Sequence, residues 1–279
     1  MRTIGAYSGC CFVREGEISV KIIEKKSNIL YNIEHKNRDH GSHGTGQEVV
    51  QMKALLTIDD VPEKVHREVT DYLLEKGIPA VFFAIGQSAE TNRESIIYAL
   101  QNGFHVGNHT YTHANLGELT YEEAIAEIEK CEAVIDSLYQ EAGVERTYKF
   151  FRFPYLSKGN ETREALQKYL RDNGFTKLKD DGVGGPLYAD MRAKDEIDVG
   201  CSFDIQEYLM HGNPDIRIDW VLNRMEKGDE GNPLFGDDVK HIILLHTHDY
   251  SNELAPGYYK AIIEKMLENG TEFLTPEFL

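Results

Sequence analysis

Two neighbouring carboxylates, Asp59 and Asp60, stand at the end of an apolar run in the stretch "LLTIDDVP". Such a run is typical of a buried β-strand, and adjacent side chains of an extended chain point in opposite directions. In the simplest interpretation, Asp60 caps a helix that begins near Pro62, and Asp59 pairs with an arginine. Other motifs in the chain are needed to distinguish a catalytic or metal-binding role for this pair from a structural one.

The stretch "HTYTH" places His109 and His113 four residues apart. That spacing brings two imidazoles together on one helical face or within one turn, which suits a shared metal ion. The metalloprotease motif HExxH is excluded, because Thr110 stands where its glutamate is required. Two histidines need at least one further ligand, and an aspartate at a neighbouring strand end would supply it. A buried structural pair of histidines is the alternative.

Three further apolar runs end in reactive side chains. These are Arg152 in "FRFPY", Asp204 and Glu207 in "FDIQEY", and His246 and His248 in "LLHTHD". The carboxyl ends of parallel strands meet at one face of a barrel, where active sites gather. We therefore expect these side chains to share one site with the carboxylate pair and the histidine pair.

From Ala54 onward, apolar strand-like runs alternate with amphipathic helical ones, which is typical of parallel βαβ units. We expect the fold class α/β, as a distorted (β/α) barrel of about seven parallel strands, with a doubly wound sheet as the second choice. Thr120 and Glu123 fit a capping box. The expected strands are 54–60, 78–86, 104–110, 148–155, 175–181, 197–205 and 241–249, and the expected helices are 62–77, 88–103, 119–143, 160–174 and 256–270.

Composition narrows the classes of partner. The 279 residues carry a formal charge of -17, which argues against binding nucleic acid and anionic membrane surfaces, although an acidic balance also simply keeps a protein soluble. No run approaches the ~20 apolar residues of a membrane span. The four cysteines form no CxxC pair, so no thiolate zinc site is indicated. We expect a cytoplasmic protein, or an extracytoplasmic one if a leader was trimmed before Met1.

Residues 1–52 differ in composition from the rest and are interpreted as a small, strand-rich N-terminal extension of unknown role. They contain a loop rich in Gly, His and Asn, in which His35, His40 and His43 could form a metal cluster. Loop histidines without a supporting carboxylate or cysteine pattern are more often solvated, and we expect that here. Residues 53–279 are expected to form the catalytic domain.

The ordered series "TIDD", "HTYTH", "RFPY", "DIQEY" and "LLH" resembles the motifs of the NodB-type polysaccharide deacetylases, carbohydrate esterase family four. The resemblance covers roughly residues 53–279. It implies a distorted (β/α) barrel with an Asp-His-His site for a divalent metal ion, commonly Zn²⁺, although Co²⁺ or Ni²⁺ would accept the same ligands. It also implies that the partner is an acetylated glycan. The family removes N-acetyl groups from chitin-like or peptidoglycan sugars, or O-acetyl groups from xylan.

The resemblance also implies a role for each matching residue. Asp60, His109 and His113 would bind the metal ion. Asp59 would be the general base, oriented by Arg152, and His246 would be the general acid, oriented by Glu207. The backbone N–H near Tyr155 would help to bind the oxyanion. The substrate pocket would be lined by Phe153, Tyr155, Tyr208 and Leu244.

Four positions depart from the family pattern: Ile58 stands where Phe is usual, Val61 for Gly, Glu207 for Asp and Tyr208 for Trp. Because Glu207 is one methylene longer, Asp204 could orient His246 instead. His248, two residues further on, shares the strand face of His246 and could act as the acid or line the cleft.

Two other functions remain open. The same scaffold could hydrolyse a small N-acyl or cyclic amide or a phosphoester, or the protein could be a carbohydrate-binding or regulatory protein with an impaired site. Trp220, Tyr188 and Tyr250 could stack on sugar rings, but ordinary packing is the simpler interpretation. The sequence does not indicate an oligomeric state.

Overall fold

The computed structural model describes residues 51–191, 196–228, 232–236 and 239–279. The expectations for residues 1–50, including the strand-rich extension and His35, His40 and His43, lie outside the described residues. Val49–Leu279 forms one compact unit. Within the described part of the chain, we find no helix with the length and apolar character needed to cross a membrane.

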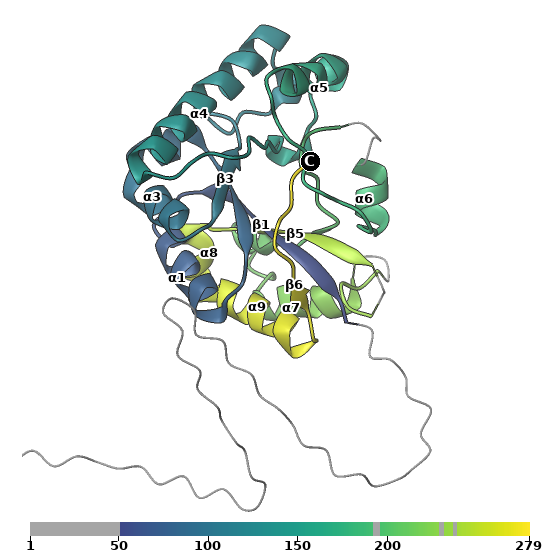
Figure 1. Cartoon of the computed structure of the whole chain (residues 1–279). Coiled ribbons are helices and arrows are strands. Elements are labelled where there is room, and N and C mark those ends of the chain that lie inside the picture. Colours follow the sequence, from purple (N-terminus) through teal and green to yellow (C-terminus); the bar gives the residue numbers. More distant parts are fainter. Residues whose placement is uncertain (1–50, 192–195, 229–231, 237–238) are drawn as a thin grey trace, which may run out of the picture. The chain divides into compact units, whose positions relative to one another are not determined.

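The described residues form a parallel sheet of six strands, of which β1, β3, β5 and β6 are labelled near the centre of Figure 1. The order is β3-β2-β1-β5-β4, and β6 pairs with the start of β1. The strands are β1 (Lys53–Val61), β2 (Ala80–Ala84), β3 (His105–Asn108), β4 (Phe203–Asp204), β5 (Lys240–His246) and β6 (Glu272–Phe273). Strand β1 therefore lies between β2 and β5, and its carboxyl end is central to the site.

Helices surround the outside of the strands, with α1, α3 and α4 at left and α7 and α9 below in Figure 1. The α-helices are α1 (His66–Lys76), α2 (Gly86–Thr91), α3 (Arg93–Gln101), α4 (Tyr121–Ala142), α5 (Arg163–Asp172), α6 (Pro186–Met191), α7 (Ile218–Lys227), α8 (Asp249–Leu254) and α9 (Tyr258–Glu268). Four 3-10 turns are η1 (Leu116–Glu118), η2 (Pro154–Leu156), η3 (Asn160–Thr162) and η4 (Glu207–Met210).

The two faces of β1 bury different side chains, as the two-residue period of a strand requires. Leu56 and Ile58 belong to the large core under the outer helices, whereas Leu55 belongs to a second core on the inner side. In β5, Leu245 belongs to the outer core and Leu244 to the inner one. The same alternation, continued toward the carboxyl end of each strand, directs Asp59 of β1 and His246 of β5 inward, toward the interior of the barrel.

The inner side is covered by the segments 148–191 and 196–202, which depart most from the sequence prediction. The expected strands 148–155 and 175–181 make only isolated bridges: Asn108↔Phe151 and Lys149↔Phe175 are parallel, and Leu178↔Phe278 is antiparallel. Apolar packing holds these segments instead: Phe150 approaches Gly107 so closely that a Cβ there would lie 2.3 Å from the Phe150 ring. The barrel is thus distorted where packing replaces a regular hydrogen-bonded ladder, and the expected strand 197–205 shortens to β4.

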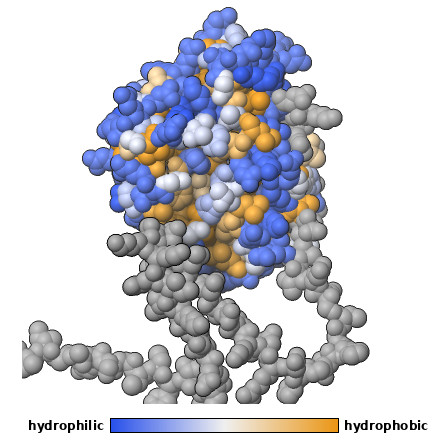
Figure 2. Space-filling model, in the orientation of Figure 1, coloured by the Kyte–Doolittle hydropathy of each residue, from blue (hydrophilic) through white to orange (hydrophobic). Residues whose placement is uncertain are grey.

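Most predicted helices are present, with shifted ends. The capping box of Thr120 and Glu123 on α4 is confirmed, and α1 ends at Gly77 in a left-handed conformation. The helix predicted over 88–103 is divided at Asn92 into α2 and α3. The prediction that a helix begins near Pro62 was wrong, because α1 starts at His66. Helices α6, α7 and α8 were not predicted. The visible surface is mainly hydrophilic with scattered apolar side chains (Figure 2), in keeping with the acidic composition.

Candidate active site

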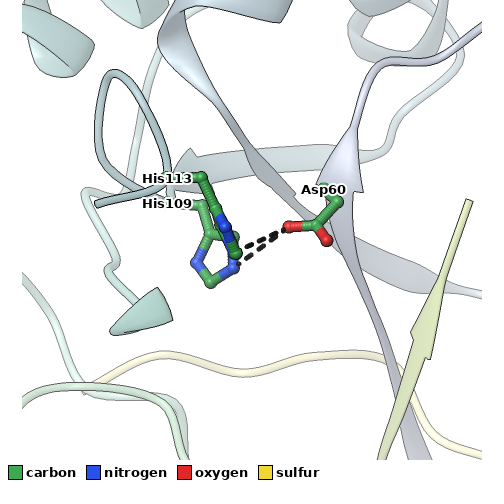
Figure 3. A group of neighbouring side chains, drawn as sticks. All are labelled: Asp60, His109 and His113. Carbon is green, nitrogen blue, oxygen red and sulfur yellow. Dashed lines mark ion pairs between the residues drawn. The ribbon is translucent and has the colours of Figure 1, made fainter. Parts of the chain in front are cut away.

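Asp60, His109 and His113 form the one group among the described residues whose potential metal-ligand atoms all lie within 4.8 Å of one another. Figure 3 shows both imidazoles directed at the carboxylate from a loop opposite the end of β1. Asp60 Oδ1 lies 3.4 Å from His109 Nε2 and 3.2 Å from His113 Nε2. The predicted ligand trio is therefore brought together.

The two histidines are carried by an irregular turn after β3. Thr110 and His113 have positive φ angles of 63° and 61°, so the turn is not helical. Asn108, fully buried at the end of β3, holds the turn: its Oδ1 accepts a hydrogen bond from the Thr110 N–H at 2.8 Å. Its amide donates to the Ile128 carbonyl and to Glu132 on α4. The turn is thus fixed to both the sheet and a long helix.

The two aspartates do not point in opposite directions as the alternation predicted. Asp60 has a φ angle of 61°, and the register of β1 against β2 shifts between Ile58 and Val61. Because the chain is not extended at Asp60, its carboxylate turns toward the same side as Asp59. Both carboxylates approach the His109 Nε2 atom, at 3.5 Å for Asp59 and 3.4 Å for Asp60. Their different partners, rather than opposite directions, distinguish them. The cap alternative for Asp60 was also wrong, since α1 has no side-chain cap.

Asp59 is paired with a buried arginine. Arg152 Nη1 donates to Asp59 Oδ1 at 2.7 Å and to Thr57 Oγ1 at 2.8 Å. The rest of the fully buried guanidinium donates to the Val199 and Gly200 carbonyls, so its position is fixed on all sides. This network leaves Asp59 with one oxygen held and the other facing the metal-ligand group.

His246 is paired with Glu207 rather than with Asp204. Glu207 Oε1 lies 2.9 Å from His246 Nδ1 and also accepts the His246 backbone N–H at 2.9 Å. Asp204 instead contacts the Gln206 N–H and the Tyr208 hydroxyl. The additional methylene of glutamate is accommodated, because η4 begins after a left-handed Gln206 and presents Glu207 to β5.

Two imidazoles here have opposite electrostatic surroundings. Burial lowers the pKa of His246, but the charge and the hydrogen bond of Glu207 outweigh it and raise that pKa to about 10. Burial lowers the pKa of His113 to about 4. At neutral pH His246 is therefore a proton donor, whereas His113 offers a lone pair.

A pocket of about 340 Å³ joins these groups. All four predicted substrate-pocket residues line it, together with Asp59, the three candidate metal ligands and His246. Tyr155, 69% exposed, stands at its rim with its ring 4.6 Å from that of His113. Of the three aromatic residues considered for stacking, Tyr250 lines the pocket, whereas Tyr188 packs in the inner core and Trp220 lies on α7, away from the lining.

Comparisons with known proteins agree with this geometry. A family model described as polysaccharide deacetylase matches residues 46–173, which include Asp59, Asp60, the histidine turn and Arg152. Residues 46–173 of this chain are therefore similar to the polysaccharide deacetylase family. Glu207 and His246 lie beyond the matched segment, so their pairing comes from the structure alone.

Several individual proteins are similar to this chain. A peptidoglycan-N-acetylglucosamine deacetylase of Bacillus cereus is 33% identical over 121 residues, 43% of this chain and 41% of that protein. A crystal structure of a peptidoglycan N-acetylglucosamine deacetylase superposes with a TM-score of 0.57 at 22% identity, covering 80% of this chain and 85% of that one. A family pseudoenzyme from Bacillus anthracis superposes with a TM-score of 0.53 at 18% identity, covering 78% and 61%. The chain spans less than half of the curated relatives it matches. The solved structures establish a shared fold.

The donor set of this site fits a divalent cation. The Oδ1 atom of Asp60 is buried without a hydrogen-bond partner, as expected for an oxygen reserved for a metal ion. His109 Nδ1 donates to the Arg152 carbonyl at 2.8 Å, which leaves the Nε2 lone pair facing Asp60. Burial raises the pKa of Asp60, but the imidazoles of His109 and His248 lower it to well below its usual value. One carboxylate and two imidazoles are a common zinc donor set.

Sequence reasoning missed several residues of the site. Leu156 lines the pocket, and Asn108 fixes the histidine turn. His248 was expected either to compete with His246 as the acid or to line the cleft. It does line the pocket, and the structure also bonds it to Asp60, which was not expected. The position of Asn108 directly before "HTYTH" could have indicated a turn-forming role, since asparagine side chains often bond backbone two residues on. Leu156 gave no comparable signal.

Proposed function

We propose that the protein is a metal-dependent hydrolase that removes acetyl groups, N-acetyl above all, from an amino-sugar glycan and releases acetate. One observation carries the proposal: two separate charged pairs, Asp59 with Arg152 and Glu207 with His246, meet at the Asp-His-His group in one pocket. Hydrolysis of an amide needs a base for water and an acid for the amine, and these pairs supply one of each.

Asp60, His109 and His113 would hold the divalent cation, most simply Zn²⁺, with three protein ligands and an open position. The bound cation would supply Lewis acidity, which polarises an acetyl carbonyl and lowers the pKa of water. The identity of the cation follows only from ligand type, and Co²⁺ or Ni²⁺ fit the same donors.

Asp59 is suited to accept the proton of the attacking water. It lies beside the ligand group without belonging to it, with Oδ2 facing His109 Nε2 and Oδ1 held by Arg152. A fixed carboxylate close to the reacting atoms needs no reorganisation before it accepts a proton. Arg152 acts by holding Asp59 in this orientation.

His246 is suited to protonate the leaving amine. The Glu207 pair keeps it protonated at neutral pH, since the pKa of His246 is raised to about 10 despite burial. As the C–N bond of the tetrahedral intermediate breaks, the imidazolium proton passes to the amine nitrogen, and the carbonyl fragment leaves as acetate. The backbone N–H near Tyr155, on a left-handed turn with φ 57°, is the proposed protein donor to the oxyanion.

The pocket suits a small acyl group with a sugar outside it. Leu244 and Phe153 supply apolar walls for a methyl group, and Tyr155 and Tyr208 present rings near the opening. Aromatic rings at the rim of such a site commonly pack against the apolar faces of sugars. The peptidoglycan deacetylase relative favours peptidoglycan fragments among the candidate glycans.

A panel of acetylated substrates tests the proposal. We expect zinc-loaded protein to release acetate from peptidoglycan fragments or chitooligosaccharides, and less from acetylated xylan. Release from small N-acyl amides alone would favour the small-amide alternative on the same scaffold. The similarity to a pseudoenzyme makes a binding protein the second candidate. Glycan binding without acetate release under Zn²⁺, Co²⁺ and Ni²⁺ would favour it.

A further inference from the structure

His248 occupies a fixed place beside the site, two residues past the end of β5. Its Nε2 atom lies 2.8 Å from Asp60 Oδ2, and its Nδ1 atom lies 2.6 Å from the Tyr250 hydroxyl. The ring stacks on His246, with centroids 5.1 Å apart and planes at 17°, and on Tyr250 at 4.6 Å and 25°. Both ring nitrogens are engaged and the residue is buried.

The directions of the two hydrogen bonds follow from chemistry. An ionised carboxylate can only accept, so His248 Nε2 carries the proton that is donated to Asp60. In the tautomer with its one ring proton on Nε2, the Nδ1 atom is an acceptor, and the Tyr250 hydroxyl donates to it. Burial and nearby acidic residues raise the pKa of Tyr250, which keeps that hydroxyl protonated. The resulting chain runs from Tyr250 through His248 to Asp60.

The two oxygens of Asp60 consequently have different surroundings. Oδ2 is bound by His248, whereas Oδ1 has no hydrogen-bond partner and faces His109 and His113. Asp60 also has a strained left-handed backbone, and the pairing of β1 with β2 is irregular there. Regular strand pairing therefore does not fix the direction of its side chain, and the contacts of the carboxylate must do so.

We propose that His248 is a positioning residue that holds Asp60 as a one-oxygen metal ligand, with Tyr250 fixing the tautomer of His248. The inference rests on the metal site of the proposed function and assigns it a partner outside the ligand trio. Partners that orient metal ligands in this way contribute about 10-fold to 100-fold to metal affinity. His248 is not a fourth ligand, because the group of mutually close ligand atoms consists of Asp60, His109 and His113.

The experiment measures Zn²⁺ affinity of the full chain by competition with a chelator, and the visible absorption of the Co²⁺-loaded protein, both without substrate. His248→Ala removes the donor to Asp60. His248→Gln retains an N–H donor at a position close to that of Nε2. Tyr250→Phe removes only the hydroxyl, and His211→Ala is the matched control. Its ring contacts Tyr250 at 4.5 Å, so the control perturbs the stack and leaves the two hydrogen bonds in place.

We expect His248→Ala to weaken Zn²⁺ binding by about 10-fold or more and to change the Co²⁺ spectrum. We expect His248→Gln to recover most of the affinity, and His211→Ala to bind like wild type. Wild-type affinity in His248→Ala would overturn the proposal. So would a folded His248→Gln that binds as weakly as His248→Ala, because the imidazole itself would then be needed.

If His248→Ala does not fold, the Zn²⁺ affinity of Tyr250→Phe tests the proposal in its place. Weaker Zn²⁺ binding than in wild type and in His211→Ala supports the proposal, and unchanged binding contradicts it. The outcome is separable from that of the proposed function. Metal affinity that depends on His248 in a protein releasing no acetate would leave this inference standing while the deacetylase function failed.

Discussion

Asp59 and Asp60 are adjacent in the chain and near the same imidazole, yet their contacts separate their roles. Asp59 is fixed by a buried guanidinium, and Asp60 by His248 on one oxygen with two imidazoles at the other. The difference arises from one backbone angle, the positive φ of Asp60, which brings a side chain from the outer face to the inner one. At the residue scale, the site depends on which partner each carboxylate has.

Asp59→Asn is expected to lower turnover by about 100-fold or more, because the amide cannot accept the water proton. Zn²⁺ binding should survive, since Asp59 is outside the ligand trio. Some stability will be lost, because the guanidinium of Arg152 stays buried without its counter-charge. Acetate release, bound zinc per chain and thermal unfolding measure the three effects. Full activity of this variant would show that Asp59 is not the base.

Glu207→Gln is expected to shift the alkaline limb of the pH–rate profile to lower pH. The wild-type pKa of His246 is raised from 6.5 to about 10 mainly by Glu207, against the effect of burial, and the amide removes that charge. The raised pKa also stabilises the fold below about pH 6.5, and this stabilisation is lost as pH rises through about 10. Turnover and thermal unfolding between pH 6 and 10 should therefore change together.

The control for this variant is Asp204→Asn, because that carboxylate bonds Gln206 and Tyr208 rather than His246. We expect it to move the alkaline limb much less. An unchanged limb in Glu207→Gln would remove His246 from the role of general acid and leave His248 to be tested in its place.

At the element scale, the site depends on a turn between β3 and the loop leading to α4. Asn108 bonds the turn with its carbonyl oxygen and α4 with its amide, so a strand, a turn and a helix share one buried side chain. The turn has two residues with positive φ angles, so its shape needs support from outside the turn. The contacts of Asn108 give this support and so bring the His109 and His113 imidazoles together.

Asn108→Ala is expected to lower the free energy of unfolding by about 1–3 kcal/mol, because buried partners lose their hydrogen bonds. It should also weaken Zn²⁺ binding, since the histidine turn loses its support. Thr120→Ala is the control: it breaks the exposed capping box of α4 at a cost of about 1 kcal/mol and leaves the turn intact. Equal metal affinity in the two variants would show that Asn108 supports only the fold.

The elements that sequence predicted well are those with a strong periodic pattern. Strands β1, β2 and β5 are continuous apolar runs, helix α4 has a clear apolar period, and the capping box on α4 marks its start. The segments 148–155 and 175–181 were predicted as strands because their residues are strand-formers, but single bridges and ring packing replaced regular pairing. Short helices such as α8 depend on tertiary contacts, and local pattern carries little information about them.

Among the site residues, the trio of ligands and the partners of Asp59 and His246 could be placed from motif order. The geometry that links them could not. The left-handed Asp60 has no signal in the letters "TIDDVP", since aspartate adopts that conformation only where its surroundings impose it. The bond from His248 to Asp60 joins residues 188 positions apart and becomes visible only in the fold.

At the scale of the whole molecule, the compact unit Val49–Leu279 contains every residue of the candidate site. We expect a chain beginning at Val49 to fold, bind Zn²⁺ and release acetate like the full chain. A chain beginning at Leu55 should instead be less stable, because it lacks Lys53 and Ala54, which pair with β6, and the buried Met52. Circular dichroism and acetate release compare the two. Loss of activity on starting at Val49 would show that earlier residues contribute to the site.

The most direct test is acetate release from peptidoglycan fragments and chitooligosaccharides by the purified chain, before and after chelation and with Zn²⁺ restored. We expect release that is lost with the metal ion, returns with it and is absent in Asp59→Asn even when that variant holds zinc. Acetate release that persists without metal, or none from any acetylated glycan with Zn²⁺, Co²⁺ or Ni²⁺ bound, would contradict a metal-dependent glycan deacetylase.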